Sequence, residues 1–342
     1  MLRISLGGSG SFDSAPSVEE WETLFAEARK HSVTAFLSRA LEILPEEQLP
    51  PLSLSSRWMM ERGRTSSRGA LADKRAAELT AIFREGGLKC CVLKGQGNAR
   101  YYPDPSSRTS GDIDLWVPGP REKTLAFLEG KYHVGSQVYI HADVDFFDDM
   151  PVEVHFHPSF FFNMVRNARL QEWFEAEAEK WEVEECAGFY RPNVLFAAVY
   201  SLSHILKHII NEGVGLRQVL DHHFIMAALP PERKEEFRKV ATEFGLSRVA
   251  AALAYVEQEV FADLASDCVF APDPVRGPKL LDDICRSGNF SHYATEGGGR
   301  ISRLLRFLPD YPSEVLWLPV RQAWEWSWRL LKGYAKFSDL KK

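Results

Sequence analysis

Residues 111–117 read GDIDLWV, and this short stretch decides the fold class. Apolar residues occupy every second position and alternate with Asp112 and Asp114. A period of two is typical of a β-strand, in which residues two apart point to the same face. We therefore predict a strand that buries one face and presents the two carboxylates together on the other.

The period-two pattern extends outward from this strand but is confined to about residues 88–157. The apolar run LKCCVL at 88–93 is bounded by glycines, which predicts a short buried strand. Further strands are predicted over about 137–147 and 151–157, with residues 148–150 as a hairpin connection. These segments are expected to form one small mixed sheet.

Helical signals flank the sheet region on both sides. Ser17 followed by Glu20 fits a capping box at the start of a helix. Helices are predicted over about 34–44, 54–86, 96–102, 120–130, 192–211, 215–228, 232–244 and 247–264. The predicted fold class is α+β, a small mixed β-sheet core flanked by helical N-terminal and C-terminal segments.

The same patterns divide the chain into four consecutive segments. They are a Gly- and Ser-rich flexible arm at 1–16, a helical segment at 17–87, the sheet core at 88–160 and a helical domain at 161–342. The Trp-rich end is expected to pack as a terminal helix rather than to attach to a membrane surface.

Composition excludes several classes of protein. The chain has 342 residues, 45% of them hydrophobic and 26% charged, which is ordinary for a globular protein and not for a disordered one. The formal net charge of −6 supplies no global basic field, which disfavours nucleic acid as a partner.

The five cysteines show no paired spacing, so neither a disulfide framework nor a zinc knuckle is expected. No run of 18 apolar residues and no signal peptide is evident, so we expect a cytoplasmic protein without a membrane span.

The paired aspartates point to metal chemistry. Two adjacent carboxylates stay ionised only beside a cation, and Mg²⁺ prefers such oxygen ligands. Glu153 shares a face of its predicted strand with His155 and His157, so it can supply a third carboxylate if the two strands are neighbours. Carboxylates gathered without a cation repel, so replacing Asp112 or Asp114 by Asn is expected to leave stability unchanged or slightly raised.

Cations and a glycine suggest where phosphates would bind. Gly95 follows the first strand and precedes a predicted helix start, where backbone amides can approach a phosphate. Lys94 and Arg108 are candidates for charge compensation, although a structural ion pair explains either of them equally well. Lys207 and Arg217, on later helices, are expected to add the further cations that a triphosphate requires.

Several motifs together resemble a known family. They are LKG at 93–95, Tyr102-Pro103, Pro105, Arg108, GDIDL at 111–115, and Glu153-Val154-His155. This set resembles the signature of an uncharacterised bacterial nucleotidyltransferase family within the polymerase-beta-like superfamily, which includes the kanamycin nucleotidyltransferases. The resemblance covers about 88–160 and extends more weakly to about 225. Gln96 departs from it, because the superfamily usually has Gly-Ser after the first strand, and the PDPSSR insertion lengthens the gap to Asp112.

The resemblance implies Mg²⁺-dependent transfer of a nucleoside monophosphate from an NTP, for example ATP, to an acceptor, with release of pyrophosphate. Asp112, Asp114 and Glu153 would be the catalytic, metal-binding residues for two Mg²⁺ ions, with Glu153 on the side of the nucleophile. The acceptor could be a small molecule, a protein side chain or an RNA end.

Two other functions fit the same residues. A non-catalytic nucleotide-binding or scaffold protein would keep the fold and bind NTP without releasing pyrophosphate. A metal-dependent phosphohydrolase would use the three carboxylates with His155 and His157, and would then prefer Mn²⁺ or Zn²⁺ to Mg²⁺.

Overall fold

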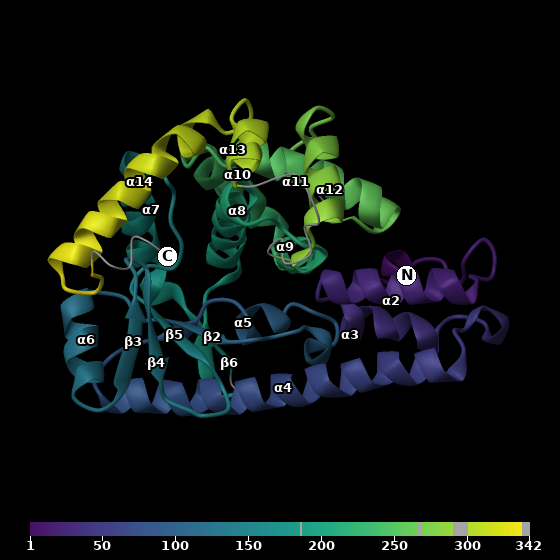
Figure 1. Cartoon of the computed structure of the whole chain (residues 1–342), viewed down its shortest axis with the longest axis horizontal. Coiled ribbons are helices and arrows are strands. Elements are labelled where there is room, and N and C mark those ends of the chain that lie inside the picture. Colours follow the sequence, from purple (N-terminus) through teal and green to yellow (C-terminus); the bar gives the residue numbers. More distant parts are fainter. Residues whose placement is uncertain (185–186, 266–267, 290–299, 337–342) are drawn as a thin grey trace. The chain divides into compact units, whose positions relative to one another are not determined.

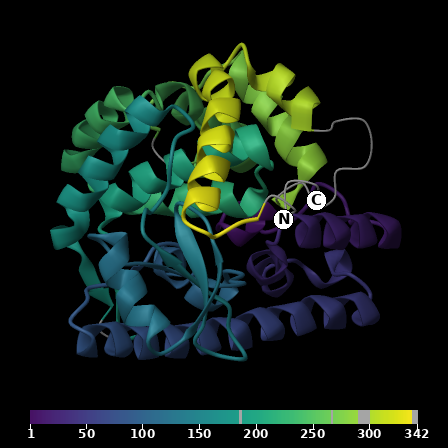
Figure 2. The ribbon, with the colours of Figure 1, turned by 60° about the vertical axis from the view of Figure 1, so that its left-hand side comes forward.

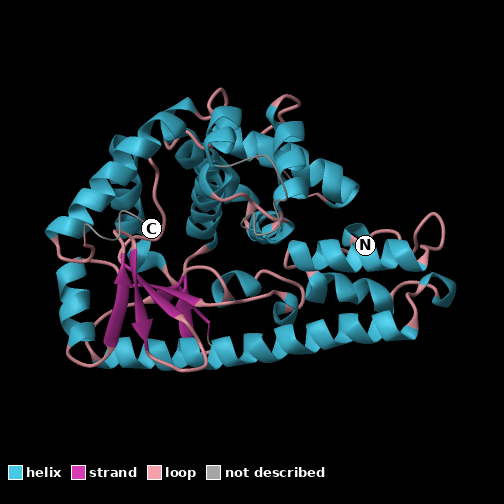
Figure 3. Cartoon of the chain, in the orientation of Figure 1, coloured by secondary structure: helices cyan, strands magenta, loops and turns pink. Residues whose placement is uncertain are grey.

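The structure is a computed structural model that describes residues 1–184, 187–265, 268–289 and 300–336. Its strands are few and lie together, and the remaining elements are helices (Figure 3). The main sheet has five strands and is mixed. The predicted α+β class with a small mixed sheet is therefore confirmed.

The chain forms two compact units, each built from three separate stretches. The first comprises Met1–Ala70, Ala99–Thr109 and Asn211–Ser302, and the second comprises Leu71–Asn98, Ser110–Ile210 and Arg303–Lys342. Because the units interleave along the sequence, they do not test the four consecutive segments expected above. That division stays a prediction.

The first unit is helical. It contains α1 (Leu2–Ser5), α2 (Val18–Lys30), α3 (Thr34–Leu37), the first part of α4 (Leu52–Glu85), α9 (Leu216–Ala228), α10 (Lys234–Glu243), α11 (Ser247–Phe261) and α12 (Arg276–Ser287), with 3-10 turns between them (Figure 1). The predicted capping box is present, because Ser17 accepts from the Glu20 amide and Glu20 accepts from the Ser17 amide. The predicted loose arm differs from the structure at its start, where α1 forms a turn with Ile4 buried.

The second unit holds the sheet. Its elements are the rest of α4, β1 (Cys91–Val92), α5 (Gln96–Ala99), β2 (Ile113–Trp116), α6 (Arg121–Glu129), β3 (His133–Gln137), β4 (His141–Asp145), β5 (Val152–His155), α7 (Met164–Glu177), β6 (Glu182–Glu184), β7 (Phe189–Arg191), α8 (Val194–Asn211), most of α13 (Arg300–Phe307) and α14 (Pro312–Leu331) (Figures 1 and 2). The strand order is β1-β2-β5-β4-β3, and β6 pairs with β7 in a separate two-stranded sheet.

The two faces of the main sheet differ in chemistry. One face carries apolar residues such as Leu115 and Val154, which pack with Leu79 and Phe83 of α4 and Leu128 of α6 in a continuous core. The opposite face carries the intervening residues, because side chains alternate along each strand. The polar groups of β2, β4 and β5 are therefore held on a rigid, well-packed support.

Some local predictions need correction. The strand expected over 137–147 is shorter in the structure, where β4 covers His141–Asp145 and a turn precedes it, in which the Val138 amide donates to the His141 carbonyl. Strand β3 (His133–Gln137) lies almost entirely before the predicted range and was not expected. The helix expected over 96–102 is only the single turn α5, and α3 gives way to a 3-10 turn at Ser38–Glu42.

Helix α8 is long and apolar enough to cross a membrane by length and composition, although no span was expected from the sequence. In the structure, 78% of it is buried inside the protein. Phe196 of α8 packs against Trp116 of β2 and Phe174 of α7, so α8 is the core helix of its unit. The terminal tryptophans Trp324 and Trp328 of α14 contact Tyr139, which agrees with the expected packing role.

Candidate active site

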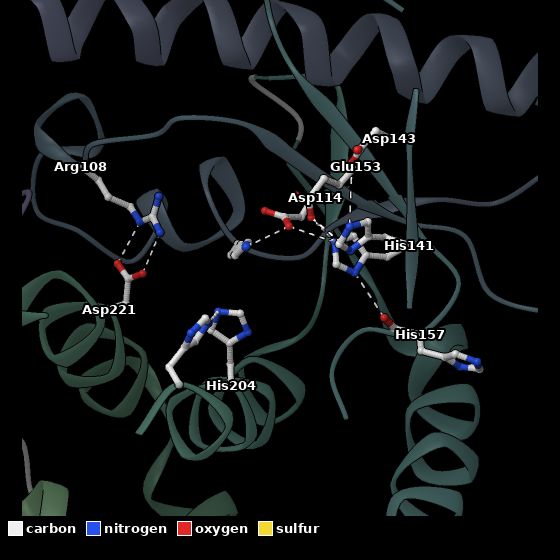
Figure 4. Close-up of polar contacts among 11 residues, drawn as sticks. Arg108, Asp114, His141, Asp143, Glu153, His157, His204 and Asp221 are labelled. Carbon is white, nitrogen blue, oxygen red and sulfur yellow. Dashed lines mark hydrogen bonds and ion pairs between the residues drawn. The ribbon is translucent and has the colours of Figure 1, made fainter. Parts of the chain in front are cut away.

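The parallel pairing of β2 with β5 brings two acidic residues together. Asp114 and Glu153 are direct partners in the register, so their side chains leave the sheet on the same face (Figure 4). Asp112 precedes β2 by one residue and points to the same side. One oxygen from each of Asp112, Asp114 and Glu153 lies within 4.8 Å of the others. The three carboxylates predicted from the sequence therefore converge.

Asp114 is the buried centre of this group. Its Oδ1 atom lies 2.9 Å from Nζ of Lys94 and 3.0 Å from Nε2 of His155. Burial alone would raise the pKa of Asp114, but Lys94 and His155 outweigh burial and hold the pKa below its usual value. Its second oxygen, Oδ2, is buried and has no hydrogen-bond partner among the described residues.

Glu153 sits between two histidines. Its Oε2 atom lies 3.2 Å from Nε2 of His155 and 3.4 Å from Nδ1 of His141. Burial alone would raise the pKa of Glu153. The hydrogen bond from His155, together with the nearby His141, outweighs burial and lowers the pKa below its usual value. Glu153 is therefore ionised at neutral pH.

The pKa values of the two histidines are shifted in opposite directions. Burial disfavours the protonated form of His155, yet its hydrogen bonds to Asp114 and Glu153 raise its pKa above the usual value. Burial and the nearby His155 lower the pKa of His141 to about 4, so His141 is neutral at physiological pH.

The loop after β1 depends on a glycine. Gly95 has φ of 58°, in the left-handed region, and a Cβ atom there would lie 3.0 Å from Oγ of Ser110 and 3.5 Å from the carbonyl oxygen of Asp112. A side chain at this position would be both strained and crowded. Gly95 therefore lets the loop pass close to the strand that carries the aspartates.

Arg108 forms a buried pair within the first unit. Its Nε donates to Oδ1 of Asp221 at 2.8 Å and its Nη2 donates to Oδ2 at 2.7 Å (Figure 4). The Tyr102 hydroxyl donates to the same carboxylate at 2.7 Å. Arg108 therefore forms a structural ion pair, which is one of the two roles expected for it. Its contact with phosphate stays a prediction.

The other expected cations lie in different units. Lys207, in the second unit, lies 5.7 Å from the ring centre of Phe160, and its charge helps to lower the pKa of His141. Arg217, in the first unit, donates to the carbonyl of Thr109 at 3.3 Å. Their contact with a nucleotide stays a prediction.

Comparison with protein families decides the identity of the chain. The model of a family described as an uncharacterised nucleotidyltransferase matches residues 17–262, which is most of the chain. The chain belongs to this nucleotidyltransferase family. No curated protein matches it. Membership supports a general role in nucleotidyl transfer, with an NTP as substrate.

Gln96 occupies the position after Gly95 where the superfamily usually has serine, and in this nucleotidyltransferase its side chain has a structural role. It is buried, and its amide nitrogen donates to Oδ1 of Asp73 on α4 at 2.7 Å. The side chain therefore anchors the loop to α4. Because α5 is a single turn, the helix N-terminus expected beside the phosphates is shorter than predicted.

Sequence reasoning missed one histidine and misplaced another. His141 was not considered, although its alternation with Asp143 and Asp145 marks a polar strand face. His157 was expected to share the face of Glu153, but β5 ends at His155, and the His157 ring instead stacks on Tyr139 at 4.5 Å and points away from the carboxylates (Figure 4). The phosphohydrolase ligand set therefore loses His157.

Proposed function

We propose that this nucleotidyltransferase transfers a nucleoside monophosphate from an NTP to an acceptor, with release of pyrophosphate, at Asp112, Asp114 and Glu153. The observation that carries the proposal is the convergence of three carboxylates from two parallel neighbouring strands. We also propose that the family lies within the polymerase-beta-like superfamily, because the resemblance of the motifs at 93–95 and 111–115 agrees with this geometry.

The residues fit a magnesium ion. Mg²⁺ prefers hard oxygen ligands and binds through a few carboxylates together with substrate phosphates. The buried Oδ2 of Asp114 has no hydrogen-bond partner among the described residues, and such an atom is costly unless a ligand satisfies it. The family resemblance implies two Mg²⁺ ions at this site. They would neutralise the triphosphate and stabilise the attacking and leaving oxygens at the α-phosphorus.

Lys94 has a defined part in the proposal. Burial disfavours its charge, but Asp114 and the neighbouring acidic groups raise its pKa above the usual value, so it stays protonated. Its side chain remains 24% exposed, and we propose that a phosphate oxygen reaches the ammonium from that side. We assign Lys94 to orienting the triphosphate while it fixes Asp114.

Glu153 is better suited to hold a cation than to take a proton. Its lowered pKa makes it a weak base, while ionisation at neutral pH favours metal binding. We therefore assign Glu153 as a ligand, and leave removal of the acceptor proton to another base. Gly95 permits close approach of the loop to substrate, and Arg108, Lys207 and Arg217 are retained as proposed phosphate contacts.

The acceptor is a small molecule, a protein side chain or an RNA end. The net charge of −6 disfavours RNA, because a nucleic acid is repelled by an acidic protein unless a basic groove binds it. We propose the cytoplasm as the compartment, since NTPs and Mg²⁺ are abundant there.

The proposal is tested in two stages. The thermal stability of the full chain is measured with each of the four NTPs, with and without Mg²⁺, because a bound ligand raises the melting temperature. The best binder, labelled at the α-phosphate, is then incubated with protein, RNA and small-molecule acceptors. We expect Mg²⁺-dependent stabilisation by at least one NTP and label transferred to one acceptor class.

The alternative functions give different results. NTP binding without pyrophosphate release would support the scaffold protein. Label released as free monophosphate, with Mn²⁺ or Zn²⁺ preferred to Mg²⁺, would support the phosphohydrolase. Either result would overturn nucleotidyl transfer as the activity of this site.

A further inference from the structure

A second set of donor atoms lies beside the carboxylates, and it contains two imidazole nitrogens. We propose that His141, Glu153 and His155 form a binding site for a transition-metal ion of the Zn²⁺ type. This inference goes beyond the proposed transfer, because metal binding here needs neither an NTP nor an acceptor. The site shares only Glu153 with the set Asp112, Asp114 and Glu153.

The distances suit such an ion. Oε2 of Glu153 lies 3.4 Å from Nδ1 of His141 and 3.2 Å from Nε2 of His155, and one donor atom of each residue lies within 4.8 Å of the others. Tetrahedral zinc, with ligand bonds of about 2.0–2.1 Å, separates its ligand atoms by roughly 3.3 Å. The three donors can therefore close around one ion with small side-chain movements.

The sheet holds the three residues in place. His141 and His155 are direct partners across the antiparallel pair β4–β5, and Glu153 is two residues before His155 on the same face. Strands fix donor atoms more precisely than loops do. The ring centres of the two histidines are 5.1 Å apart.

A backbone carbonyl orients the ring of His155 in the way that is common for metal-ligating histidines. Nδ1 of His155 lies 3.3 Å from the carbonyl oxygen of His157, so it can donate there and leave Nε2 directed at Glu153. A metal-ligating histidine commonly gives its other ring nitrogen to a carbonyl in this way. Nδ1 of His141 is buried and makes no hydrogen bond to any described residue, although it lies 3.4 Å from Oε2 of Glu153.

The donor types select the metal. Imidazole nitrogens suit Zn²⁺ and its neighbours, whereas Mg²⁺ prefers oxygen alone. Because Glu153 belongs to both sets, an ion held by the histidines takes one oxygen from the carboxylate set.

The test uses Co²⁺ as a spectroscopic probe of the zinc site. Co²⁺ is titrated into the metal-free full chain, its visible absorption is recorded, and Zn²⁺ is then added in competition. We expect one Co²⁺ per chain with absorption typical of nitrogen and oxygen ligands, displaced by Zn²⁺. His141→Gln should weaken Zn²⁺ binding by more than about tenfold, since even outer partners of a metal site contribute 10–100-fold.

Two matched variants serve as controls. His133→Gln removes an exposed histidine of β3, and Asp112→Asn removes a carboxylate of the other set, so both should bind Zn²⁺ within a few-fold of the parent. If His141→Gln does not fold, His141→Asp keeps a ligand and should shift the preference from Zn²⁺ toward Mg²⁺. Absence of Co²⁺ binding, or equal Zn²⁺ affinity in the parent and the His141 variants, would overturn the proposal without bearing on nucleotidyl transfer.

Discussion

Nζ of Lys94 lies 2.9 Å from Oδ1 of Asp114, so the protein itself supplies a cation to the central carboxylate of the site. His155 contacts the same oxygen at 3.0 Å. The charge of Asp114 is therefore balanced before any ion binds. Asp112 is only half-buried, whereas Asp114 is buried.

The two aspartates should consequently differ in their effect on stability. Asp114→Asn leaves Lys94 and His155 without their shared partner and should lower the free energy of unfolding by about 3 kcal/mol. Asp112→Asn should change it by less than about 1 kcal/mol. Urea unfolding in the presence of a chelator measures both. From the sequence, Asp114→Asn was expected to leave stability unchanged or slightly raised, and the contacts with Lys94 and His155 reverse that expectation. An Asp114→Asn variant as stable as the parent, or more stable, would contradict the new prediction.

The Arg108–Asp221 pair should contribute strongly to the stability of the fold. Arg108→Met leaves the Asp221 carboxylate buried without its bidentate partner and should cost about 3–5 kcal/mol. The double variant Arg108→Met with Asp221→Leu should recover much of that loss, because no buried charge remains. Thermal unfolding of the single and double variants gives the comparison. A fully stable Arg108→Met variant would show that the pair does not stabilise the fold, and weak NTP binding by a folded variant would support the proposed phosphate contact.

Lys207 and Arg217 should contribute to NTP binding. Loss of a charge-assisted contact costs about 1.5–3 kcal/mol, so Lys207→Ala and Arg217→Ala should each weaken affinity by about tenfold or more while folding is retained. Lys131→Ala and Arg238→Ala remove exposed cations and are the matched controls. Calorimetric titration with Mg²⁺ and NTP measures the affinities. Parent-like affinity in both variants would assign these residues to other contacts.

Acid should destabilise the protein through buried neutral histidines. Nδ1 of His31 accepts from the Leu216 amide at 3.3 Å, and burial, followed by Lys30, lowers the pKa of His31 to about 4. Above the unfolded-state pKa of about 6.5 this group has no pH-dependent effect. As the pH falls from about 6.5 to 4, His31 takes up a proton in the unfolded state but stays neutral in the folded state. The free energy of unfolding therefore decreases in that window.

His31→Asn tests this contribution, because asparagine does not titrate and can still accept from the Leu216 amide. We expect its free energy of unfolding to fall less steeply than that of the parent between pH 6.5 and 4, by up to about 3 kcal/mol over the window. His133→Gln, at an exposed site, should keep the parent slope. Equal slopes in the parent and His31→Asn would show that His31 is not held neutral.

The sheet could be predicted where alternation and local turns agree. The strand at 111–117 and the capping box at Ser17 depend on neighbours in sequence, and both were found. Residues 138–140 are valine, tyrosine and isoleucine, which favour a strand, yet the chain turns there. Tyr139 contacts His157, Trp324 and Trp328, and these distant partners override the local preference.

The candidate site shows the same limit. Alternation placed Asp114 and Glu153 on strand faces, but only the pairing of β2 with β5 makes them neighbours. His141 joins them through the pairing of β4 with β5, which no local pattern specifies. Arg108 could not be assigned from sequence, because its partner Asp221 lies 113 residues away.

The most direct test of the central claim is the initial rate of Mg²⁺-dependent pyrophosphate release, compared between the parent and Asp112→Asn. Asp112 is less buried than Asp114, so we expect circular dichroism to show both proteins folded. We predict release in the parent that a chelator abolishes, and a rate at least about 100-fold lower in the variant, because a direct metal ligand should matter at least as much as an outer partner. Equal rates in the two proteins, or no release by the parent with any NTP, would contradict the account.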